Sequence, residues 1–434
     1  MIGNLAKGGK EMGRFENVIG YEAVKEQLNI ALDAMLEGEK YRKLGVTVPK
    51  GILLDGEPGV GKTLLAKEFV AESGRKSFLI RKNKADGVFV DFIRETFDEA
   101  ANNTPSIILL DDMDKFANED SFHRNAEEYV TIQSCIDDVR NKDVFVIATT
   151  NDLHIMPDSL LRSGRFDWVF SLNVPEAEDS EKIISYYLKD KRVERDVDTM
   201  ELARFARGYS CASLEKIVND AGLHAGFEGH ELISQTDLIQ SILRTFYGMK
   251  SNDKTIPMAI QKRIAVHEAG HVVISEILYP GSVDFASISC GFGSKAEGFT
   301  SYMPDEEEVY LFEGLEKQIM IALGGKASVE VITGEIDMGA NRDMHEAFNA
   351  VRRILDDHTS YDFDSWCHGN ETAETVFSNL DRATGLEVSR YYKKVKQLLI
   401  QNREFLEAVV EALYEKKTIS YKDLEQISAL RKSA

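Results

Sequence analysis

Cysteine is scarce in this sequence, and its four residues, Cys135, Cys211, Cys290 and Cys367, are widely separated. No two of them have the close spacing of a thiolate zinc site, and a disulfide framework needs a denser set. We therefore expect neither kind of cross-link in the fold. The pattern is typical of a reducing compartment, so we expect a cytoplasmic protein.

Basic residues and long apolar runs are also lacking. The chain has 52 Lys and Arg against 73 Asp and Glu, a net charge of −21, which argues against a nucleic-acid partner. Its longest apolar runs, such as SIILL at 106–110, are far shorter than the ~20 residues that span a bilayer. The N-terminus lacks the apolar core of a signal peptide. We therefore expect no membrane anchor in this chain.

The sequence does contain an alternation of short apolar runs with helical periodicity. Four runs have the composition of buried parallel strands, at 51–56, 77–80, 106–112 and 144–151. Helical patterns at 62–73 and 90–103 lie between them. This order predicts an α/β fold in which helices flank a parallel sheet.

Beyond residue 175 the pattern is mainly helical. The length of 434 residues allows two or three domains, and the polar stretch at 248–257, which ends in a proline, predicts a linker between two of them. The segment at 284–304 predicts a pair of strands, of which 285–290 is expected to offer an edge to an extended peptide. The end of the chain, at 403–427, predicts helix, turn and helix.

The segment GEPGVGKT follows the first predicted strand and begins a helix. Gly56, Gly61, Lys62 and Thr63 fit the G-x-x-x-x-G-K-[ST] pattern of a phosphate-binding loop. The glycines let backbone N–H groups approach phosphate oxygens, and the helix N-terminus adds partial positive charge. Lys62 can reach the outer phosphates and the Thr63 hydroxyl can hold Mg²⁺, so the loop predicts ATP and Mg²⁺ as cofactors.

Polar residues end two further predicted strands. Asp111 can bind Mg²⁺ through water, Asp112 can orient the attacking water, and Asn151 can contact the γ-phosphate or that water. Many such ATPases have Glu at the second position. Asp is one methylene shorter and places its carboxylate ~1.5 Å back, so ATP binding is better supported than fast hydrolysis. A solvated acid at a strand end is the alternative for Asp112.

Two arginines follow in the segment SLLRSGRFD. Arg162 and Arg165 have no obvious acidic neighbour in the sequence. An arginine offered to the nucleotide of a neighbouring subunit would stabilise transition-state charge, which requires a ring of subunits. A surface salt bridge is the alternative.

The segment KRIAVHEAGHVVISEIL, residues 262–278, has the H-E-x-x-H pattern of zinc peptidases. His267 and His271 are about one helical turn apart, so both imidazoles can bind one Zn²⁺. Glu268 lies where it can take a proton from a water at the metal and pass it to the leaving amine. The alternative is that the two histidines are exposed or lie at the edge of the core and bind no metal. The apolar residues around them disfavour it.

A catalytic zinc needs a third protein ligand and an open fourth position. Ile277 stands where the metzincin pattern has a third His, so an acid elsewhere must serve. On spacing alone the candidates are Glu297, Glu330, Asp337 and Asp343. Asp337 or Glu330 can instead orient an imidazole N–H.

Several segments together have the order and spacing of an AAA+ ATPase module: RFENVIGYEAVKEQL, GEPGVGKT, IILLDDMD and ATTNDLHIMPDSLLRSGRFD. The segment ARGYSCASLEKIVNDAGLHA looks like the helical lid of such a module. With HEAGH behind them, the chain from about residue 15 to 430 resembles the FtsH family of ATP-dependent zinc metalloproteases. The resemblance selects Asp343 as the third zinc ligand, because MGANRDMHEAF matches the turn that carries it in the family.

The resemblance also implies further nucleotide contacts and a division into segments. The implied contacts, besides those above, are Ile19, Gly20, Glu57, Pro58, Gly59, Val60 and Leu64. The implied segments are a flexible tail at 1–14, a large α/β ATPase subdomain at 15–174, a small helical subdomain at 175–248, a linker at 249–257 and a helical zinc peptidase domain at 258–434. Family members are normally anchored by transmembrane helices, so we expect membrane association only through an anchor outside this chain.

Two segments depart from the family pattern. The gripping aromatic of the pore loop aligns near Ala85, and Phe89 is the best substitute, although a core position in the next helix suits Phe89 equally well. In ALGGKASVEVITGE, Lys326 replaces Arg and Val329 stands where an acid is common.

The leading hypothesis is an ATP-dependent zinc endopeptidase that unfolds protein substrates in a homohexameric ring and cuts them at a His/His/Asp site. One alternative is a zinc peptidase for peptides or unfolded proteins with weak or merely regulatory ATPase, favoured by Asp112 and the altered pore loop. Another is a chaperone-like AAA+ remodeller with an inactive peptidase platform. The intact set His267, Glu268, His271 and Asp343 argues against that last reading.

Overall fold

The computed structural model describes residues 15–83, 86–117, 126–162, 164–249, 257–289, 298–303, 311–336, 340–356 and 373–433. The chain divides into two compact units, one of residues up to 190 with 206–219, the other of 191–205 with residues from 220 onward. The expected tail at 1–14 and most of the expected linker at 249–257 lie outside the described residues. No helix within the described ranges is long and apolar enough to cross a membrane.

The first unit contains a parallel five-stranded sheet with the order β2-β3-β4-β1-β5. Its strands are β1 (Gly51–Gly56), β2 (Lys76–Ile80), β3 (Ser106–Leu110), β4 (Val144–Thr150) and β5 (Trp168–Leu172). The four predicted strands are confirmed. The edge strand β5 was missed because Val169 and Ser171 are exposed, so it lacks the continuous apolar run of a buried parallel strand.

Helices cover both faces of this sheet, which confirms the predicted α/β fold. They are α1 (Glu22–Leu36), α2 (Gly38–Lys43), α3 (Lys62–Glu72), α4 (Asp86–Asn102) and α5 (Ala126–Asp138), with short 3₁₀ turns η1 (Met113–Lys115) and η2 (Leu153–Ile155). Ile52 and Leu54 of β1 pack with α1 and α3, whereas Leu53 packs with α4 and α5. Successive strand residues therefore alternate between two cores.

The carboxyl ends of the central strands lie together. Asp55 of β1 is in register with Thr150 of β4, and Leu110 of β3 with Ala148 of β4. Because the three strands are parallel neighbours, the loops that follow them meet at one edge of the sheet, where open α/β sheets bind their ligands.

The residues between 175 and 248 are helical, as predicted, with one isolated bridge between Val193 and Ile233. The helices are α6 (Ala177–Leu188), α7 (Thr199–Phe205), α8 (Cys211–Glu228) and α9 (Gln235–Phe246). Helix α6 and the start of α8 belong to the first unit, and α7 and α9 belong to the second. The expected boundaries of a single helical subdomain at 175–248 remain a prediction.

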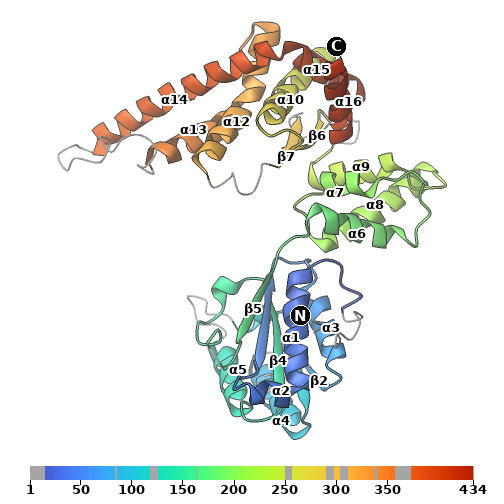
Figure 1. Cartoon of the computed structure of the whole chain (residues 1–434), viewed down its shortest axis with the longest axis vertical. Coiled ribbons are helices and arrows are strands. Elements are labelled where there is room, and N and C mark those ends of the chain that lie inside the picture. Colours follow the sequence, from blue (N-terminus) through green and yellow to red (C-terminus); the bar gives the residue numbers. More distant parts are fainter. Residues whose placement is uncertain are drawn as a thin grey trace, which may run out of the picture. The chain divides into compact units, whose positions relative to one another are not determined.

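The second unit combines long helices with a small antiparallel sheet (Figure 1). The helices that follow α9 are α10 (Met258–Leu278), α12 (Phe312–Thr333), α13 (Asn341–Asp356), α14 (Ala373–Gln401), α15 (Arg403–Lys416) and α16 (Tyr421–Ser433). The sheet has the order β7-β6-β8, with β6 (Val283–Ser287), β7 (Phe299–Tyr302) and β8 (Thr418–Ser420).

This small sheet confirms the predicted pair of strands and corrects two details. The segment expected to offer an edge, beginning at Phe285, is the central strand β6, and β7 is the edge strand that lies towards the histidine helix. The turn predicted between the last two helices contains β8, because Ile419 pairs with Ala286 and is fully buried. A three-residue strand is too short to give a recognisable period in the sequence.

Helices α10 and α12 cross in direct backbone contact. A Cβ atom at Gly270 would lie 2.2 Å from the carbonyl oxygen of Gly324, and one at Gly324 would lie 2.7 Å from that of Gly270. Only glycine at both positions permits this approach. The hydroxyl of Ser328 donates to the carbonyl of Val266 at 2.6 Å and adds a hydrogen bond between the same helices. The crossing places α12 against the histidine-bearing part of α10.

Helix α7 is joined to β6 by a buried ion pair. The guanidinium Nε of Arg204 lies 2.8 Å from Oδ1 of Asp284, which is fully buried. The ring of Phe205 stacks on that of Phe285 with 4.4 Å between centroids. A buried carboxylate that loses its partner costs ~3–5 kcal/mol, so this contact fixes α7 on the sheet of the second unit.

Candidate active site

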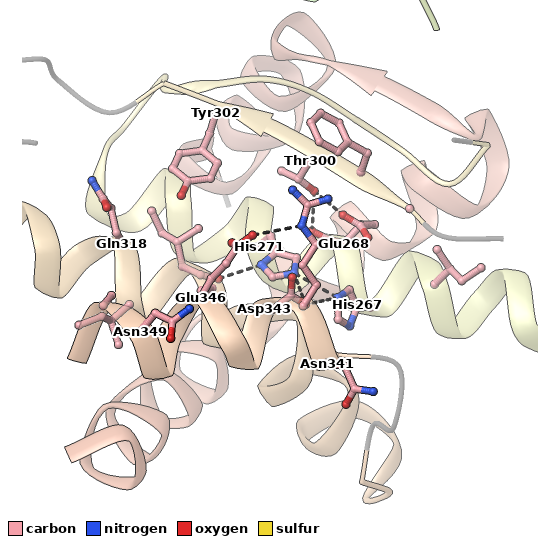
Figure 2. A pocket seen from close by; sticks show the side chains of 18 of the residues that line it. His267, Glu268, His271, Thr300, Tyr302, Gln318, Asn341, Asp343, Glu346 and Asn349 are labelled. Atoms are coloured by element: carbon pink, nitrogen blue, oxygen red, sulfur yellow. Dashed lines mark hydrogen bonds and ion pairs between the residues drawn. The ribbon is translucent and has the colours of Figure 1, made fainter. Parts of the chain in front are cut away.

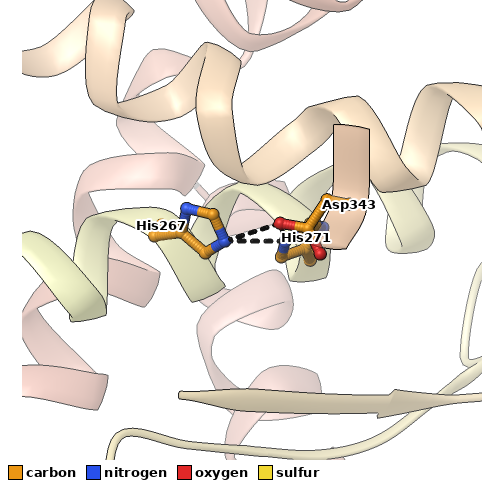
Figure 3. A group of neighbouring side chains, drawn as sticks. All are labelled: His267, His271 and Asp343. Atoms are coloured by element: carbon orange, nitrogen blue, oxygen red, sulfur yellow. Dashed lines mark hydrogen bonds and ion pairs between the residues drawn. The ribbon is translucent and has the colours of Figure 1, made fainter. Parts of the chain in front are cut away.

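Two histidines of α10 and one aspartate of α13 converge on one point. Nε2 of His267 lies 3.1 Å from Nε2 of His271 and 3.1 Å from Oδ2 of Asp343, and the third separation, from His271 to Asp343, is 3.5 Å. Figure 3 shows the three side chains directed towards each other from the two helices. Asp343 lies in the first turn of α13, so a residue 72 positions beyond His271 reaches the pair through tertiary packing.

The ionisation of these groups suits a cation. Burial raises the pKa of Asp343, but hydrogen bonds from the two imidazoles and their charges outweigh that effect and hold the pKa well below its usual range. The Nδ1–H of His271 donates to the carbonyl oxygen of Ile321 at 2.8 Å. Because that nitrogen keeps its proton, Nε2 of His271 would present a lone pair to a metal ion at the convergence point once the ion replaces the proton shared with Asp343.

The geometry fits zinc. In an ideal tetrahedron with metal–ligand distances of ~2.0–2.2 Å, two ligand atoms lie ~3.3–3.6 Å apart, close to the three separations observed. The space beside them is kept open by Gly325, where a Cβ atom would lie 2.5 Å from Nε2 of both His267 and His271. Among the described residues, the group whose ligand atoms meet at this point consists of these three side chains, so a fourth position stays open for substrate or water.

The competing acids do not reach this point where the structure describes them. Glu330 accepts hydrogen bonds from Tyr392 at 2.7 Å and from Lys396 at 2.6 Å. The predictions that Glu330 is the third zinc ligand, or that it orients an imidazole, are therefore both wrong. Glu297 and Asp337 lie outside the described residues. Val329 is fully buried in the apolar core of this unit, where an unpaired acid would be costly.

Glu268 is buried beside the ligands, with 5% of its surface exposed. Its Oε2 accepts a hydrogen bond of 2.7 Å from the hydroxyl of Thr300 on β7. Sequence reasoning missed Thr300, because nothing in FTSY distinguishes one hydroxyl from its neighbour until β7 is placed above α10. The buried carboxylate next to the metal ligands is positioned for proton transfer.

A cavity of about 1180 Å³ opens over these residues (Figure 2). One wall is the edge strand β7, with Phe299, Thr300 and Tyr302. The rest of the lining mixes apolar side chains of α12, such as Leu315 and Ile319, with polar ones such as Gln318, Glu346 and Asn349. An extended chain of several residues fits a cavity of this size and lies along an unpaired strand edge.

The phosphate-binding loop of the first unit has the predicted strand–loop–helix context. Its lysine is buried, with 6% exposed, and the Lys62 ammonium donates to the carbonyl oxygens of Gly56 at 2.6 Å and Glu57 at 2.7 Å. Burial lowers the pKa of Lys62, and nearby acids partly oppose that effect. The lysine therefore has protein partners that it must exchange for phosphate oxygens.

The expected Mg²⁺ ligands lie together. The Thr63 hydroxyl donates to Oδ1 of Asp111 at 2.8 Å, and the Thr149 hydroxyl donates to the same oxygen at 3.0 Å. Thr149 was missed from the sequence, because it contacts Asp111 only through the pairing of β4 with β3.

Asp112 is held by two cations. Its Oδ2 lies 2.7 Å from the ammonium of Lys115 and 3.1 Å from the guanidinium of Arg81. Burial raises the pKa of Asp112, but the hydrogen bonds and charges of Lys115 and Arg81 outweigh it, so the pKa lies below the usual value of 3.8. The sequence pattern did not single out Arg81, which follows β2 and reaches Asp112 across the sheet edge.

The other polar residues of this site have these positions. The side-chain amide of Asn151 lies 3.2 Å from both carboxylate oxygens of Asp114, a residue that sequence reasoning missed. Gly20 has a φ of 78° and approaches Asp179 closely, since a Cβ atom there would lie 2.4 Å from Oδ2 of Asp179. The backbone N–H of Ala212, at the start of α8, donates to the carbonyl of Gly59.

The remaining predicted loop residues are spread over the surface and core of the same segment. Pro58 and Leu64 are exposed, Val60 is fully buried, and Ile19 is partly buried. The hydroxyl of Tyr21 lies 2.9 Å from the carbonyl oxygen of Val60, which ties the segment after Ile19 to the phosphate-binding loop.

At two positions of this unit the structure favours the alternative that the sequence left open, a salt bridge for Arg165 and a core position for Phe89. Arg165 has an acidic partner, Asp137 of α5, with Nη2 to Oδ2 at 2.7 Å and Nε to Oδ1 at 3.1 Å; the acid lies 28 residues upstream and is not visible as a neighbour in the sequence. Phe89 is fully buried in α4 against Phe116, with 5.2 Å between centroids, so it is a core residue and not a gripping aromatic. Arg162 is exposed and has no partner among the described residues, and Ala85 lies outside them.

Two family models match the chain, one over the nucleotide site and the other over the proposed zinc site. The ATPase family associated with various cellular activities (AAA) matches residues 52–174, and peptidase family M41 matches residues 254–427. A curated relative from Petrotoga mobilis, named ATP-dependent zinc metalloprotease FtsH 2, is 30% identical over 444 residues that cover 95% of this chain and 70% of the relative.

The chain belongs to the FtsH family of ATP-dependent zinc metalloproteases. A relative named ATP-dependent zinc metalloprotease FtsH, from Caldicellulosiruptor bescii, is 28% identical over 450 residues, covering 96% of this chain and 72% of the relative. A relative of the same name from Ureaplasma parvum is 30% identical over 444 residues, which cover 97% of this chain and 61% of the relative. The predicted family, fold and enzyme class are thereby confirmed, with Zn²⁺, ATP and Mg²⁺ as the implied cofactors.

Proposed function

We propose that this FtsH-family enzyme hydrolyses peptide bonds of protein substrates at the site formed by His267, Glu268, His271 and Asp343. The observation that carries the proposal is the convergence of two imidazole nitrogens and one carboxylate oxygen, with separations of 3.1, 3.1 and 3.5 Å. The three residues are the zinc ligands, and the ion supplies Lewis-acid chemistry at the peptide carbonyl.

Glu268 is the proton carrier of the reaction. It takes a proton from water as the water oxygen attacks the carbonyl carbon, and it gives that proton to the amide nitrogen as the carbon–nitrogen bond breaks. Burial to 5% exposure keeps competing solvent away from the carboxylate. The substrate lies extended along β7, where backbone pairing fixes its register and side chains enter the apolar part of the cavity.

The first unit binds ATP and Mg²⁺ through the phosphate-binding loop. Lys62 leaves its two loop carbonyls for the outer phosphates, while Thr63 and Asp111 hold Mg²⁺. Asp112 and Asn151 orient the attacking water. Arg162, exposed and without a described partner, reaches the nucleotide of the next subunit in a homohexamer, and Arg165 does so only after leaving Asp137.

A second candidate function is a zinc peptidase with slow ATPase that acts on peptides and unfolded proteins. The contacts of Asp112 with Arg81 and Lys115 favour it, because a carboxylate bound to two cations is less available to orient water. The burial of Phe89 favours it as well, since it removes the proposed gripping side chain. The division into segments at 15–174, 175–248 and 258–434, and the cytoplasmic location, remain predictions.

Metal analysis beside proteolysis tests the peptidase site. Glu268→Gln keeps the shape and the zinc ligands but removes the proton acceptor, so we expect one zinc per chain and a loss of casein cleavage of ~10²–10⁴-fold. A variant that cuts at the wild-type rate would remove Glu268 from its role. Chelation of the wild type is the matched control and should also stop cleavage.

Lys62→Ala distinguishes the two candidates. If ATP drives unfolding, this variant loses ATPase activity and the degradation of a folded substrate but still cleaves a short peptide. If the second candidate is correct, the wild type itself fails to degrade the folded substrate with ATP. Sedimentation with ATP tests the hexamer, and a monomer under those conditions would contradict the ring.

A further inference from the structure

Strand β7 holds the side chain of Glu268 from the side opposite to α10. The Thr300 hydroxyl lies 2.7 Å from Oε2 of Glu268, and it is the one hydrogen-bond partner of this carboxylate among the described residues. An ionised carboxylate only accepts hydrogen bonds, so the hydroxyl is the donor. The bond joins residues 32 positions apart and is shielded in a partly buried site.

The other carboxylate oxygen is kept in a narrow space by Gly298. A Cβ atom at this residue would lie 2.4 Å from Oε1 of Glu268 and 2.3 Å from its Cγ. The backbone that leads into β7 therefore passes close to the carboxylate, and a residue without a side chain is needed at this position. Thr300 bonds one carboxylate oxygen, and the absence of a side chain at Gly298 leaves space for the other.

Threonine is well suited to this role. Thr300 is in register with Ala286 of the central strand β6, which is fully buried, so its backbone is fixed by the sheet. Its branched Cβ restricts rotation about χ1, and the hydroxyl stays directed at Glu268 with little loss of entropy. A group that transfers protons must be held to within ~0.5 Å of its productive position, which an unsupported Glu side chain with three free torsions does not achieve.

We infer that Thr300 is a positioning residue for Glu268. Its hydroxyl stays bonded to Oε2, and Oε1 is the atom that accepts the proton from water and then returns it to the leaving nitrogen. The water O–H bond breaks as the oxygen bonds to the carbonyl carbon, and the proton on Oε1 moves to nitrogen as the carbon–nitrogen bond breaks. The inference rests on the proposed role of Glu268.

The test compares Thr300→Val with Thr300→Ser in the full chain, using steady-state cleavage of a fluorogenic peptide, zinc content and ATPase rate. Valine keeps the shape and removes the donor, whereas serine keeps the donor. We expect the valine variant to lose about tenfold or more in kcat, with KM and zinc content unchanged, and the serine variant to retain kcat within about threefold of the wild type. Ser301→Ala, one residue along the same strand, is the matched control and should match the wild type.

Three outcomes would overturn the inference: an unchanged kcat in Thr300→Val, an equal loss in both Thr300 variants, or a loss carried by KM or by missing zinc. Melting temperature and ATPase rate show whether a variant is folded. If Thr300→Val does not fold, Thr300→Ala replaces it in the comparison with Thr300→Ser, since only the side chain that donates should support kcat. Failure of the proposed function would look different, because the Glu268→Gln variant would then cleave the peptide at the wild-type rate.

Discussion

The peptidase site and the nucleotide site of this chain differ in how their polar groups are satisfied. Around the proposed zinc position, the donor atoms of His267, His271 and Asp343 point at one another with separations that suit a metal. In the nucleotide site, the charged ends of Lys62 and Asp112 are bonded to other protein groups. The polar groups of the first site share one point of convergence, whereas the charges of the second are paired with groups at separate positions.

This difference teaches where each activity is controlled. The zinc ligands come from α10 and α13, which both pack against α12, α10 through the glycine crossing, so the cost of arranging them is met during folding. The nucleotide site contains alternative partners for its charges, so binding and hydrolysis depend on exchange. We therefore expect substitutions in the first site to have large effects and those around Asp112 to have graded ones.

The largest expected effect is that of Asp343→Asn. The amide is a poor zinc ligand, so the comparison predicts a loss of bound zinc and of peptide cleavage by more than ~100-fold, because even contacts outside the ligand shell are worth ~10–100-fold. Zinc content measured by mass spectrometry together with peptide cleavage checks this. Full zinc occupancy with normal cleavage would assign the third ligand to another acid. ATP binding should remain.

A smaller loss is expected for Gly325→Ala. Its methyl group would lie 2.5 Å from Nε2 of both histidines and would displace them or the ion, lowering zinc affinity by ~10–100-fold. Zinc competition with a chromogenic chelator measures this. Gly385→Ala on α14 is the control, because a Cβ atom there meets nothing within 4 Å. Equal zinc affinities of the two variants would show that the space at Gly325 is not needed.

A graded effect is expected for Arg81→Gln. Removing one of the two cations on Asp112 frees its carboxylate, so the ATPase rate should rise by roughly two- to fivefold, the scale of an exposed ion pair of ~0.5–1 kcal/mol. Peptide cleavage without ATP should not change. Arg403→Gln removes a surface ion pair in the other unit and serves as the control. A lower ATPase rate would mean that Arg81 supports the site.

The smallest effect concerns pH. The pKa of Asp112 lies below its usual value of 3.8 in the folded chain. Its ion pairs therefore stabilise the fold at pH values above 3.8, and this stabilisation is lost as the pH falls through the folded pKa. Between about pH 6 and 9 the carboxylate stays charged. The ratio of the ATPase rates of wild type and Asp112→Asn should therefore stay constant over that range. A ratio that changes by more than about threefold would show that Asp112 titrates there.

The sequence predicts those features of the molecule that are determined by residues close together in the chain. The strands β1, β3 and β4 are continuous apolar runs, the phosphate-binding loop follows β1, and the histidines are one turn apart on a helix. Each of these features is visible within about twenty residues, because strand burial and helical spacing are local properties.

Contacts across long distances in sequence could not be predicted in the same way. Thr300 reaches Glu268, Arg165 reaches Asp137, and Arg81 reaches Asp112 only once strands and helices are packed. The position of Phe89 was ambiguous because the sequence around it fits both a loop and the start of a helix. The packing of α4 on the sheet places Phe89 in the core. The choice of Asp343 over Glu330 came from the family resemblance, not from spacing, since spacing does not define tertiary convergence.

The most direct test of the account is a crystal structure of the zinc-loaded chain with anomalous scattering measured at the zinc edge. We predict one zinc ion bound by Nε2 of His267, Nε2 of His271 and a carboxylate oxygen of Asp343, at ~2.0–2.2 Å, with the fourth position open to the cavity. Zinc bound elsewhere, or a fourth protein ligand that closes that position, would contradict it.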